Sequence, residues 1–305
     1  MLRNALLWAS TNPFLAQRLP TYGFVRRATR RFMPGETLPE AIREALRLRG
    51  EGIPTTFTLL GENVTTPHEA DAVADHYLEV LEAVRGSGLD TEVSVKPTQL
   101  GLDLGLEAAV QRLARILRAG GGVMVWIDME SSSYVDATLE MFRAVRGDHP
   151  NVGLCLQAYL HRTRDDLEGL LPLNPAIRLV KGAYKEPPDV AFPKKADVDQ
   201  NFIRLTSVLL KARKEERVGR PVMGTHDPRM IAEGNRMAHE LGLAKDAYEV
   251  AMLFGIQTEE QRRLVRTGHT VRVLVAYGKH WFPWYMRRLA ERPANVWFVM
   301  KQLLG

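Results

Sequence analysis

Eight short apolar runs, separated by stretches with helical spacing, dominate the sequence after residue 50. Each run is rich in β-branched or other apolar residues, as a buried strand requires, and the stretches between them place apolar residues along one side of a helix. The runs occupy 55–62, 91–101, 122–130, 152–159, 176–184, 221–228, 247–255 and 270–278. Because they are nearly continuously apolar, they favour parallel strands covered by helices.

A strand followed by a helix, repeated eight times over roughly 250 residues, is the plan of a (β/α)₈ barrel. A doubly wound sheet is the alternative, but it would normally carry a Gly-rich turn after its first strand, and "LLGENVTT" is not such a turn. The sequence therefore predicts an α/β fold, a TIM barrel over residues 51–305. Residues 1–50 are expected to form an N-terminal helical extension that leads into the first strand.

Composition limits the classes of function. The chain has 45% hydrophobic and 25% charged residues, and no apolar run is long enough to cross a bilayer. Its single cysteine, Cys155, cannot form an intrachain disulfide, which indicates a packed core thiol in an intracellular protein. The net charge of +5 permits contact with nucleic acid or an anionic membrane. Arg26, Arg27, Arg30 and Arg31 share roughly one helical side, either as a solvated face or as an interfacial helix on anionic lipid.

Polar side chains stand at the C-terminal ends of most predicted strands, where barrel enzymes carry out their chemistry. These residues are Glu62, Lys96, Asp128, Gln157, Lys181 with Tyr184, Thr225 with His226, and Tyr277, whereas strand seven ends with Leu253. Together they predict a deep polar site rather than a metal cluster, because no His/Cys group has ligand spacing.

Two further features concern the strands themselves. Arg178 stands in the middle of its strand and needs a buried anion or acceptor, whereas Gly182 and Ala183 would let a ligand approach the backbone closely. Glu249 and Arg272 begin strands seven and eight, and we expect them to pair with each other at the bottom of the barrel.

The stretch "FPWYMRRLAERP" (282–293) predicts a helix that starts at the barrel mouth, since it follows strand eight. At about 100° per residue, Arg287 and Arg288 diverge and Glu291 projects between them. One interpretation is a surface pair between Arg287 and Glu291. The other is a clamp for a carboxylate or phosphate, formed over the mouth beside Tyr285.

Eight motifs occur in order from the second predicted strand to the last helix: "SVKPTQLG", "DME", "LQAY", "RLVKGAY", "THDP", "LFGI", "RVLVAYG" and "WYMRRLAER". Together they resemble the proline dehydrogenases, both the monofunctional bacterial kind and the domain of proline utilization A. The resemblance implies a distorted (β/α)₈ barrel with FAD that oxidises L-proline to Δ¹-pyrroline-5-carboxylate, the first step of proline catabolism. Hydride would pass to flavin N5 and electrons to a membrane quinone. It also implies a cytoplasmic location, peripheral at the inner face of the membrane.

The resemblance implies roles for individual residues. Asp128 and Arg178 would lie nearest the reaction, and Glu62 would pair with Arg287 as a gate. Residues that bind the substrate would be Lys96, Tyr184, Leu253, Tyr277, Tyr285, Arg287 and Arg288. Residues that bind the flavin would be Met129, Gln157, Arg178, Lys181, Gly182, Ala183, Thr225, His226 and Glu291.

Other functions are compatible with parts of this pattern. Lys96 and Lys181 at strand ends could serve a Schiff-base aldolase. A flavin-dependent folate reductase barrel would leave the arginine pair unexplained. A basic nucleic-acid-binding protein would fit the pI near 9.3, but the chain lacks an aromatic-interleaved RNA motif or a DNA-reading helix.

Overall fold

A computed structural model describes residues 8, 12–18, 22 and 29–291, without the side chains of residues 13, 16, 17, 287, 290 and 291. Arg26 and Arg27 of the basic cluster therefore lie outside the described residues. Arg30 and Arg31 are described, and both are exposed.

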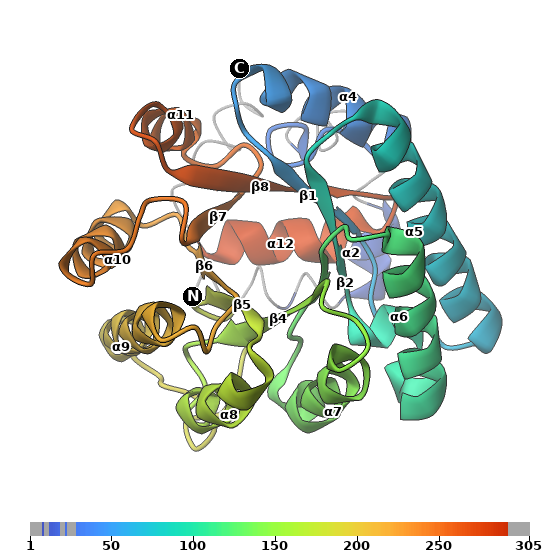
Figure 1. Cartoon of the computed structure of the whole chain (residues 1–305). Helices are drawn as coiled ribbons and strands as arrows, with labels where there is room; N and C mark the ends of the chain where they lie inside the picture. The colour runs from blue at the N-terminus through green and yellow to red at the C-terminus, as the bar shows by residue number, and fades with distance from the viewer. Residues whose placement is uncertain (1–7, 9–11, 19–21, 23–28, 292–305) are drawn as a thin grey trace.

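Eight parallel strands close into a barrel in chain order (Figure 1). They are β1 (Thr55–Leu59), β2 (Thr91–Val95), β3 (Val125–Ile127), β4 (Val152–Gln157), β5 (Ala176–Val180), β6 (Arg220–Gly224), β7 (Glu249–Leu253) and β8 (Thr270–Tyr277). The barrel closes because β1 pairs in parallel with both β2 and β8. Seven of the eight predicted runs contain one of these strands and the run 221–228 overlaps β6, so the predicted TIM barrel is confirmed.

Helices follow the first seven strands and surround the barrel (Figure 1). They are α5 (Pro67–Ser87), α6 (Leu106–Gly120), α7 (Val135–Arg146), α8 (Thr163–Leu170), α9 (Lys195–Lys214), α10 (Pro228–Glu240) and α11 (Thr258–Arg266). Local sequence sets their ends, as α5 illustrates. Thr66 Oγ1 accepts from the Glu69 N–H at 3.2 Å and the Glu69 carboxylate accepts from the Thr66 N–H at 3.1 Å. The helix ends at Gly88, which adopts the left-handed conformation.

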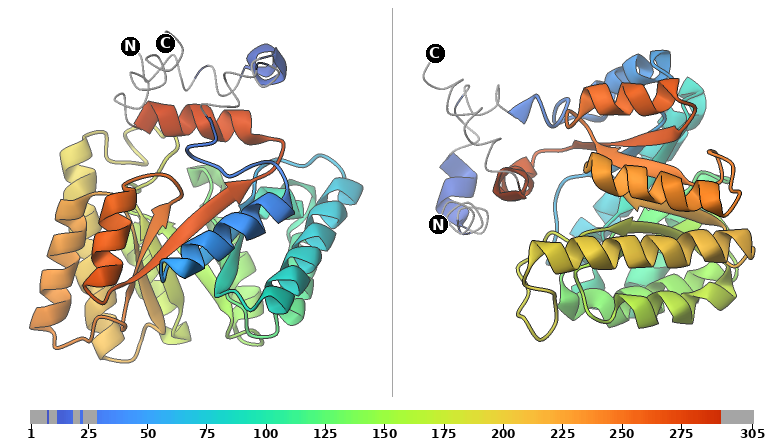
Figure 2. Two further views of the ribbon diagram at one scale, coloured as in Figure 1. Left: turned by 90° about the horizontal axis from the view of Figure 1, so that it is seen from above. Right: turned by 90° about the vertical axis from the view of Figure 1, so that its left-hand side faces the viewer.

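The eighth helix departs from the regular plan. α12 (Trp281–Glu291) lies across the barrel end, as predicted, instead of packing outside β8 (Figure 2). The place beside β8 and β1 is taken by α4 (Leu38–Gly50), which precedes β1 in the chain. The short helix α2 (Pro13–Arg18) lies on the same side of the molecule as α12 (Figure 2). The division at residue 50 stays a prediction, but α4 itself is part of the outer layer.

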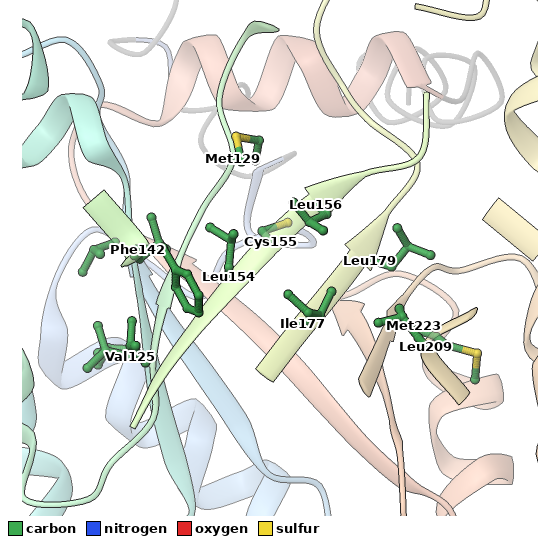
Figure 3. Packing of buried hydrophobic residues seen from close by; sticks show 14 of the residues in the cluster. Val125, Met129, Phe142, Leu154, Cys155, Leu156, Ile177, Leu179, Leu209 and Met223 are labelled. Atoms are coloured by element: carbon green, nitrogen blue, oxygen red, sulfur yellow. The ribbon is translucent and has the colours of Figure 1, made fainter. Parts of the chain in front are cut away.

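The apolar core lies between the strands and the outer helices (Figure 3). Leu154 and Leu156 of β4 belong to one buried cluster with Phe142 of α7 and Leu209 of α9. Because side chains alternate along a strand, the residues between them, such as Cys155, face the barrel interior. The interior is therefore free to carry the polar residues of a site.

Candidate active site

A buried arginine and an aspartate meet on the inner face of the barrel. Arg178 of β5 is 5% exposed, and its Nη2 donates to Asp128 Oδ1 and, at 2.8 Å, to Ser94 Oγ. Ser94 Oγ in turn donates to Asp128 Oδ1 at 2.7 Å. Burial opposes the charge of Arg178, but the charge of Asp128, together with the contributions of Cys155 and Glu92, outweighs burial and raises the pKa of the guanidinium. The anion that the position of Arg178 requires is therefore the partly exposed Asp128.

Cys155 completes this group. It is buried, as predicted, and it is the partner of Arg178 in the register of β4 and β5. Burial raises the pKa of its thiol, and the neighbouring Arg178 guanidinium opposes that rise. The thiol thus lies on the inner face beside the charged group, and it also contacts the large apolar cluster.

A second charged group fills the opposite, N-terminal end of the barrel. Arg272 Nε lies 3.2 Å from Glu249 Oε2 and 3.3 Å from Glu92 Oε2. Arg220 forms ion pairs with the same two carboxylates. The predicted pair between Glu249 and Arg272 is confirmed, and Glu92 and Arg220 extend it into a network.

A pocket of about 590 Å³ opens at the mouth between the end of β1, the start of α5 and the start of α12. Glu62 and Lys96 line it, together with Gln99, His280 and Trp284. Lys96 is 9% exposed, and its Nζ donates to the Leu59 carbonyl at 3.4 Å. The mouth therefore combines a buried cation with an aromatic wall.

The site contains residues that the sequence reasoning did not assign. The amide oxygen of Gln99 is buried and accepts no hydrogen bond within the described part of the chain. Glu130 accepts from the Thr98 N–H at 2.9 Å and from Thr98 Oγ1 at 2.7 Å. Burial raises the pKa of the Glu130 carboxyl, which is typical of functional sites. Gln99 lies in the motif "SVKPTQLG" and Glu130 in the motif "DME". Membership of these motifs was the sequence signal that could have identified both as site residues.

The residues expected to bind a cofactor connect neighbouring strand ends. Gln157 Nε2 donates to the Met129 carbonyl at 3.1 Å, and its Oε1 is buried without a partner among the described residues. The Leu253 N–H donates to His226 Nε2 at 2.8 Å. Thr225 Oγ1 accepts from the Asp227 N–H at 3.2 Å. These bonds fix the ends of β4, β6 and β7 around the mouth.

Lys181 and Gly182 have partners within the protein. Lys181 Nζ forms an ion pair with Asp199 and lies 3.6 Å from Asp227 Oδ2. An ion-paired ammonium is not the uncharged amine that a Schiff base needs. Gly182 has φ +113°, and a Cβ there would lie 2.2 Å from the Tyr159 ring. The glycine is thus required by a neighbouring side chain of the protein itself. Ala183 and Tyr184 follow it, both partly exposed.

The two tyrosines expected around the substrate lie in different places. Tyr277 forms a hydrogen bond of 2.8 Å between its hydroxyl and His76 Nε2 of α5, so its ring points outward from β8. On the inner face of β8 the partly exposed Leu274 is in register with Leu253. The structure thus separates Tyr277 from the inner face and brings Leu274 to it.

Tyr285 of α12 packs instead against Phe32 and Trp281, with ring centroids 5.9 and 6.1 Å away. Its hydroxyl is buried and has no hydrogen-bond partner within the described residues, and burial raises its pKa to about 12. Tyr285 therefore belongs to the apolar cluster that attaches α12 to the chain segment before α4.

The arginine pair lies on α12, above the mouth (Figure 2). Arg288 is partly exposed, and its Cζ lies 6.0 Å from the centre of the Trp284 ring. The side chains of Arg287 and Glu291 lie outside the described part of the structure. The clamp, the gate with Glu62 and the pair with Glu291 therefore stay predictions.

The described residues offer neither a membrane-spanning helix nor a metal-binding group. None of the helices within them is long and apolar enough to cross a membrane. Within the same residues, no group of three or more His, Cys, Asp or Glu side chains is arranged to hold a metal ion.

Comparison with known proteins gives a consistent result. The family model described as proline dehydrogenase matches residues 41–301. Proline dehydrogenase 1 of Bacillus subtilis subsp. natto is 38% identical over 306 residues, which cover 100% of this chain and 99% of the relative. Proline dehydrogenase of Deinococcus radiodurans is 39% identical over 283 residues, or 90% and 89% of the two chains.

Solved structures agree in fold. Proline utilization A from Bdellovibrio bacteriovorus superimposes with a TM-score of 0.82 at 25% identity, covering 95% of this chain and 36% of that chain. The protein from Corynebacterium freiburgense gives a TM-score of 0.75 at 21% identity, covering 99% of this chain and 34% of that chain. The present chain thus spans about a third of these solved chains.

Proposed function

This chain belongs to the proline dehydrogenase family, and from that premise we propose that it oxidises L-proline to Δ¹-pyrroline-5-carboxylate. The reaction is the first step of proline catabolism, with FAD as cofactor and a membrane quinone as electron acceptor. The observation that carries the proposal is the match of the proline dehydrogenase family model over residues 41–301. The ion pair between the buried Arg178 and the partly exposed Asp128 on the inner face of the barrel gives it a chemical centre.

The residues present fit a flavin. The buried amide oxygen of Gln157 has no partner within the described residues and could accept a hydrogen bond from the N–H of a flavin ring. Arg178 supplies a permanent positive charge on the inner face. When bound, FAD would supply the acceptor for hydride at its N5. The residues that would hold it are Met129, Gln157, Arg178, Lys181, Gly182, Ala183, Thr225, His226 and Glu291.

The protein's own residues would bind and orient the substrate. We propose that Lys96, Arg287 and Arg288 bind the carboxylate of proline, because a cationic clamp fixes a carboxylate by charge-assisted hydrogen bonds. Leu253 and Leu274, which are in register on the inner face, would present apolar surface to the pyrrolidine ring. Asp128 Oδ1 already accepts from Arg178 and Ser94, so we expect the proton of the substrate amine to leave to solvent rather than to Oδ1.

The visible spectrum tests this proposal. Purified protein should show flavin absorption that bleaches when L-proline is added without oxygen. Arg288→Met should raise the KM for proline at least about tenfold and leave flavin bound, because one charge-assisted hydrogen bond contributes roughly 1.5–3 kcal/mol. Arg236→Met, which changes an exposed arginine of α10, is the control. A colourless protein that binds no added FAD would refute the proposal, and trapping of a carbonyl substrate by borohydride would favour the aldolase.

We also propose that the protein contacts the cytoplasmic face of an anionic membrane, where a quinone resides. In support, Trp8, Phe14 and Tyr22 are 62%, 64% and 47% exposed. The Arg18 guanidinium carbon lies 5.4 Å from the centre of the Phe14 ring. Exposed aromatic and basic side chains together are typical of an interfacial segment.

Flotation with anionic liposomes tests this contact. Phe14→Glu should weaken the association, whereas Leu104→Glu, at a position 41% exposed near the start of α6, should not. Equal flotation of both variants and the wild type would contradict the contact.

A further inference from the structure

An indole ring lies inside the barrel between the two charged groups. Trp126 of β3 is 1% exposed. The Arg178 guanidinium carbon lies 5.0 Å from the centre of its ring, and that of Arg220 lies 5.6 Å away. Both distances fall within the range of cation–π contacts. Trp126 therefore contacts one arginine from the group around Asp128 and one from the network at the opposite end.

The orientation of the ring is fixed from two directions. Its Nε1 donates to Glu92 Oε2 at 2.7 Å, and Glu92 is itself held by Arg220 and Arg272. On the neighbouring strand, Gly153 leaves the space that the indole occupies, because a Cβ there would lie 2.5 Å from Trp126 Cε3. A hydrogen bond and a glycine thus leave the ring little freedom to turn.

The contacts of Arg178 besides the ring involve three side chains. Ser94 and Asp128 bind its Nη2, and Cys155 neighbours it on β4. We propose that Trp126 is a positioning residue that holds the Arg178 guanidinium at the depth at which it pairs with Asp128. The expected change in kcat rests on the proposed function. The expected change in packing around Arg178 and Cys155 does not depend on it.

Four substitutions separate positioning from stability. Trp126→Leu removes the ring, and Trp126→Phe keeps an aromatic face but loses the N–H. Trp281→Phe is the matched control. Trp281 is also 1% exposed, and its Nε1 donates to a glutamate, Glu36, at 3.0 Å, but it lies on α12. Gly153→Ala displaces the indole without removing it and replaces Trp126→Leu if that variant does not fold.

Steady-state kinetics are the first measurement. Trp126→Leu should lower kcat by about 10- to 100-fold, the effect of a misplacement of roughly 1 Å at a reacting group. The KM for proline should change less than about threefold, because the proposed carboxylate clamp is elsewhere. Trp126→Phe should recover most of kcat. An unchanged kcat in Trp126→Leu, or a change confined to KM, would overturn the positioning role.

The second measurement needs neither flavin nor activity. Cys155 is the only cysteine of the chain, so alkylation by iodoacetamide reports on this site alone. In flavin-free protein, Trp126→Leu should speed alkylation at least about tenfold, because removal of the ring opens the packing around Arg178. Trp281→Phe should match the wild type. Equal rates in all variants would refute the proposal, and wild-type protein that does not oxidise proline would count only against the proposed function.

Discussion

The network at the N-terminal end of the barrel allows one prediction to be worked out in detail. The side chain of Arg272 is 7% exposed, and its Nη1 donates to the Thr55 carbonyl at 3.2 Å and lies 2.9 Å from Asp90 Oδ1. Its Nε lies 3.2 Å from Glu249 Oε2. Arg272→Met would leave the buried carboxylate of Glu92 and the largely covered carboxylate of Glu249 facing the single arginine Arg220.

Removing one partner of a buried ion pair costs about 3–5 kcal/mol, because a charge remains buried without compensation. For a chain of this size that corresponds to a decrease in Tm of about 6–10 °C, at about 2 °C per kcal/mol. The double-mutant cycle of Arg272→Met and Glu249→Gln should give a coupling energy of about 1–3 kcal/mol. Urea unfolding followed by far-UV circular dichroism measures the loss of stability and the coupling energy, and thermal unfolding measures the change in Tm.

An exposed pair provides the control. Arg236 and Glu233 of α10 lie 2.6 Å apart with side chains 54% and 33% exposed, and their coupling energy should be about 0.2–1 kcal/mol. If the cycle at Arg272 gave no larger coupling than the cycle at Arg236, the assignment of stability to the buried network would be refuted.

Three further predictions concern other parts of the molecule. Tyr277→Phe should leave the KM for proline within about twofold of the wild-type value and lower stability by about 1 kcal/mol, because the Tyr277 hydroxyl bonds to His76 outside the barrel. A large rise in KM would instead place Tyr277 in the site. Gly255→Ala should lower Tm markedly and increase proteolysis near residues 29–33, because Gly255 has a φ of +73° and a Cβ there would lie 1.6 Å from the Arg31 carbonyl oxygen. Gly86→Ala is the control, since a Cβ at Gly86 would meet no atom within 4 Å. Burial opposes the charge of Asp227, but the hydrogen bonds from Arg229 and the charges of Lys181 and Arg229 together outweigh burial and hold its pKa at about 2, below the ordinary 3.8. This stabilisation is present above pH 3.8 and is lost as pH falls towards 2. The stability deficit of Asp227→Asn should therefore shrink over that range in acid titrations of unfolding, and a constant deficit would contradict it.

The barrel could be predicted because its signal is repeated and local. Each strand is an apolar run, and residues at the ends of parallel strands meet at one edge wherever the strands lie in the barrel. Long-range partners could not be predicted in the same way. The position of Arg178 requires an anion, but the choice of Asp128, 50 residues away, depends on the register of three strands.

Side-chain direction explains the position of Tyr277. Alternation from Arg272, which faces inward, also places Leu274 inside and Tyr277 outside. A motif indicates which residues are present near a strand end but not which face they occupy. Trp126 was missed for a related reason, because an indole in an apolar run is compatible with ordinary core packing.

The position of α4 has a consequence for how the chain is made. Its buried face, formed by Ala41, Ala45 and Leu48, packs where β1 and β8 meet. A ribosome produces α4 before any strand of the barrel, but β8 only after residue 270. This apolar face therefore lacks one of its two packing partners through most of translation. We expect nascent chains to be most prone to aggregation or chaperone binding until β8 emerges.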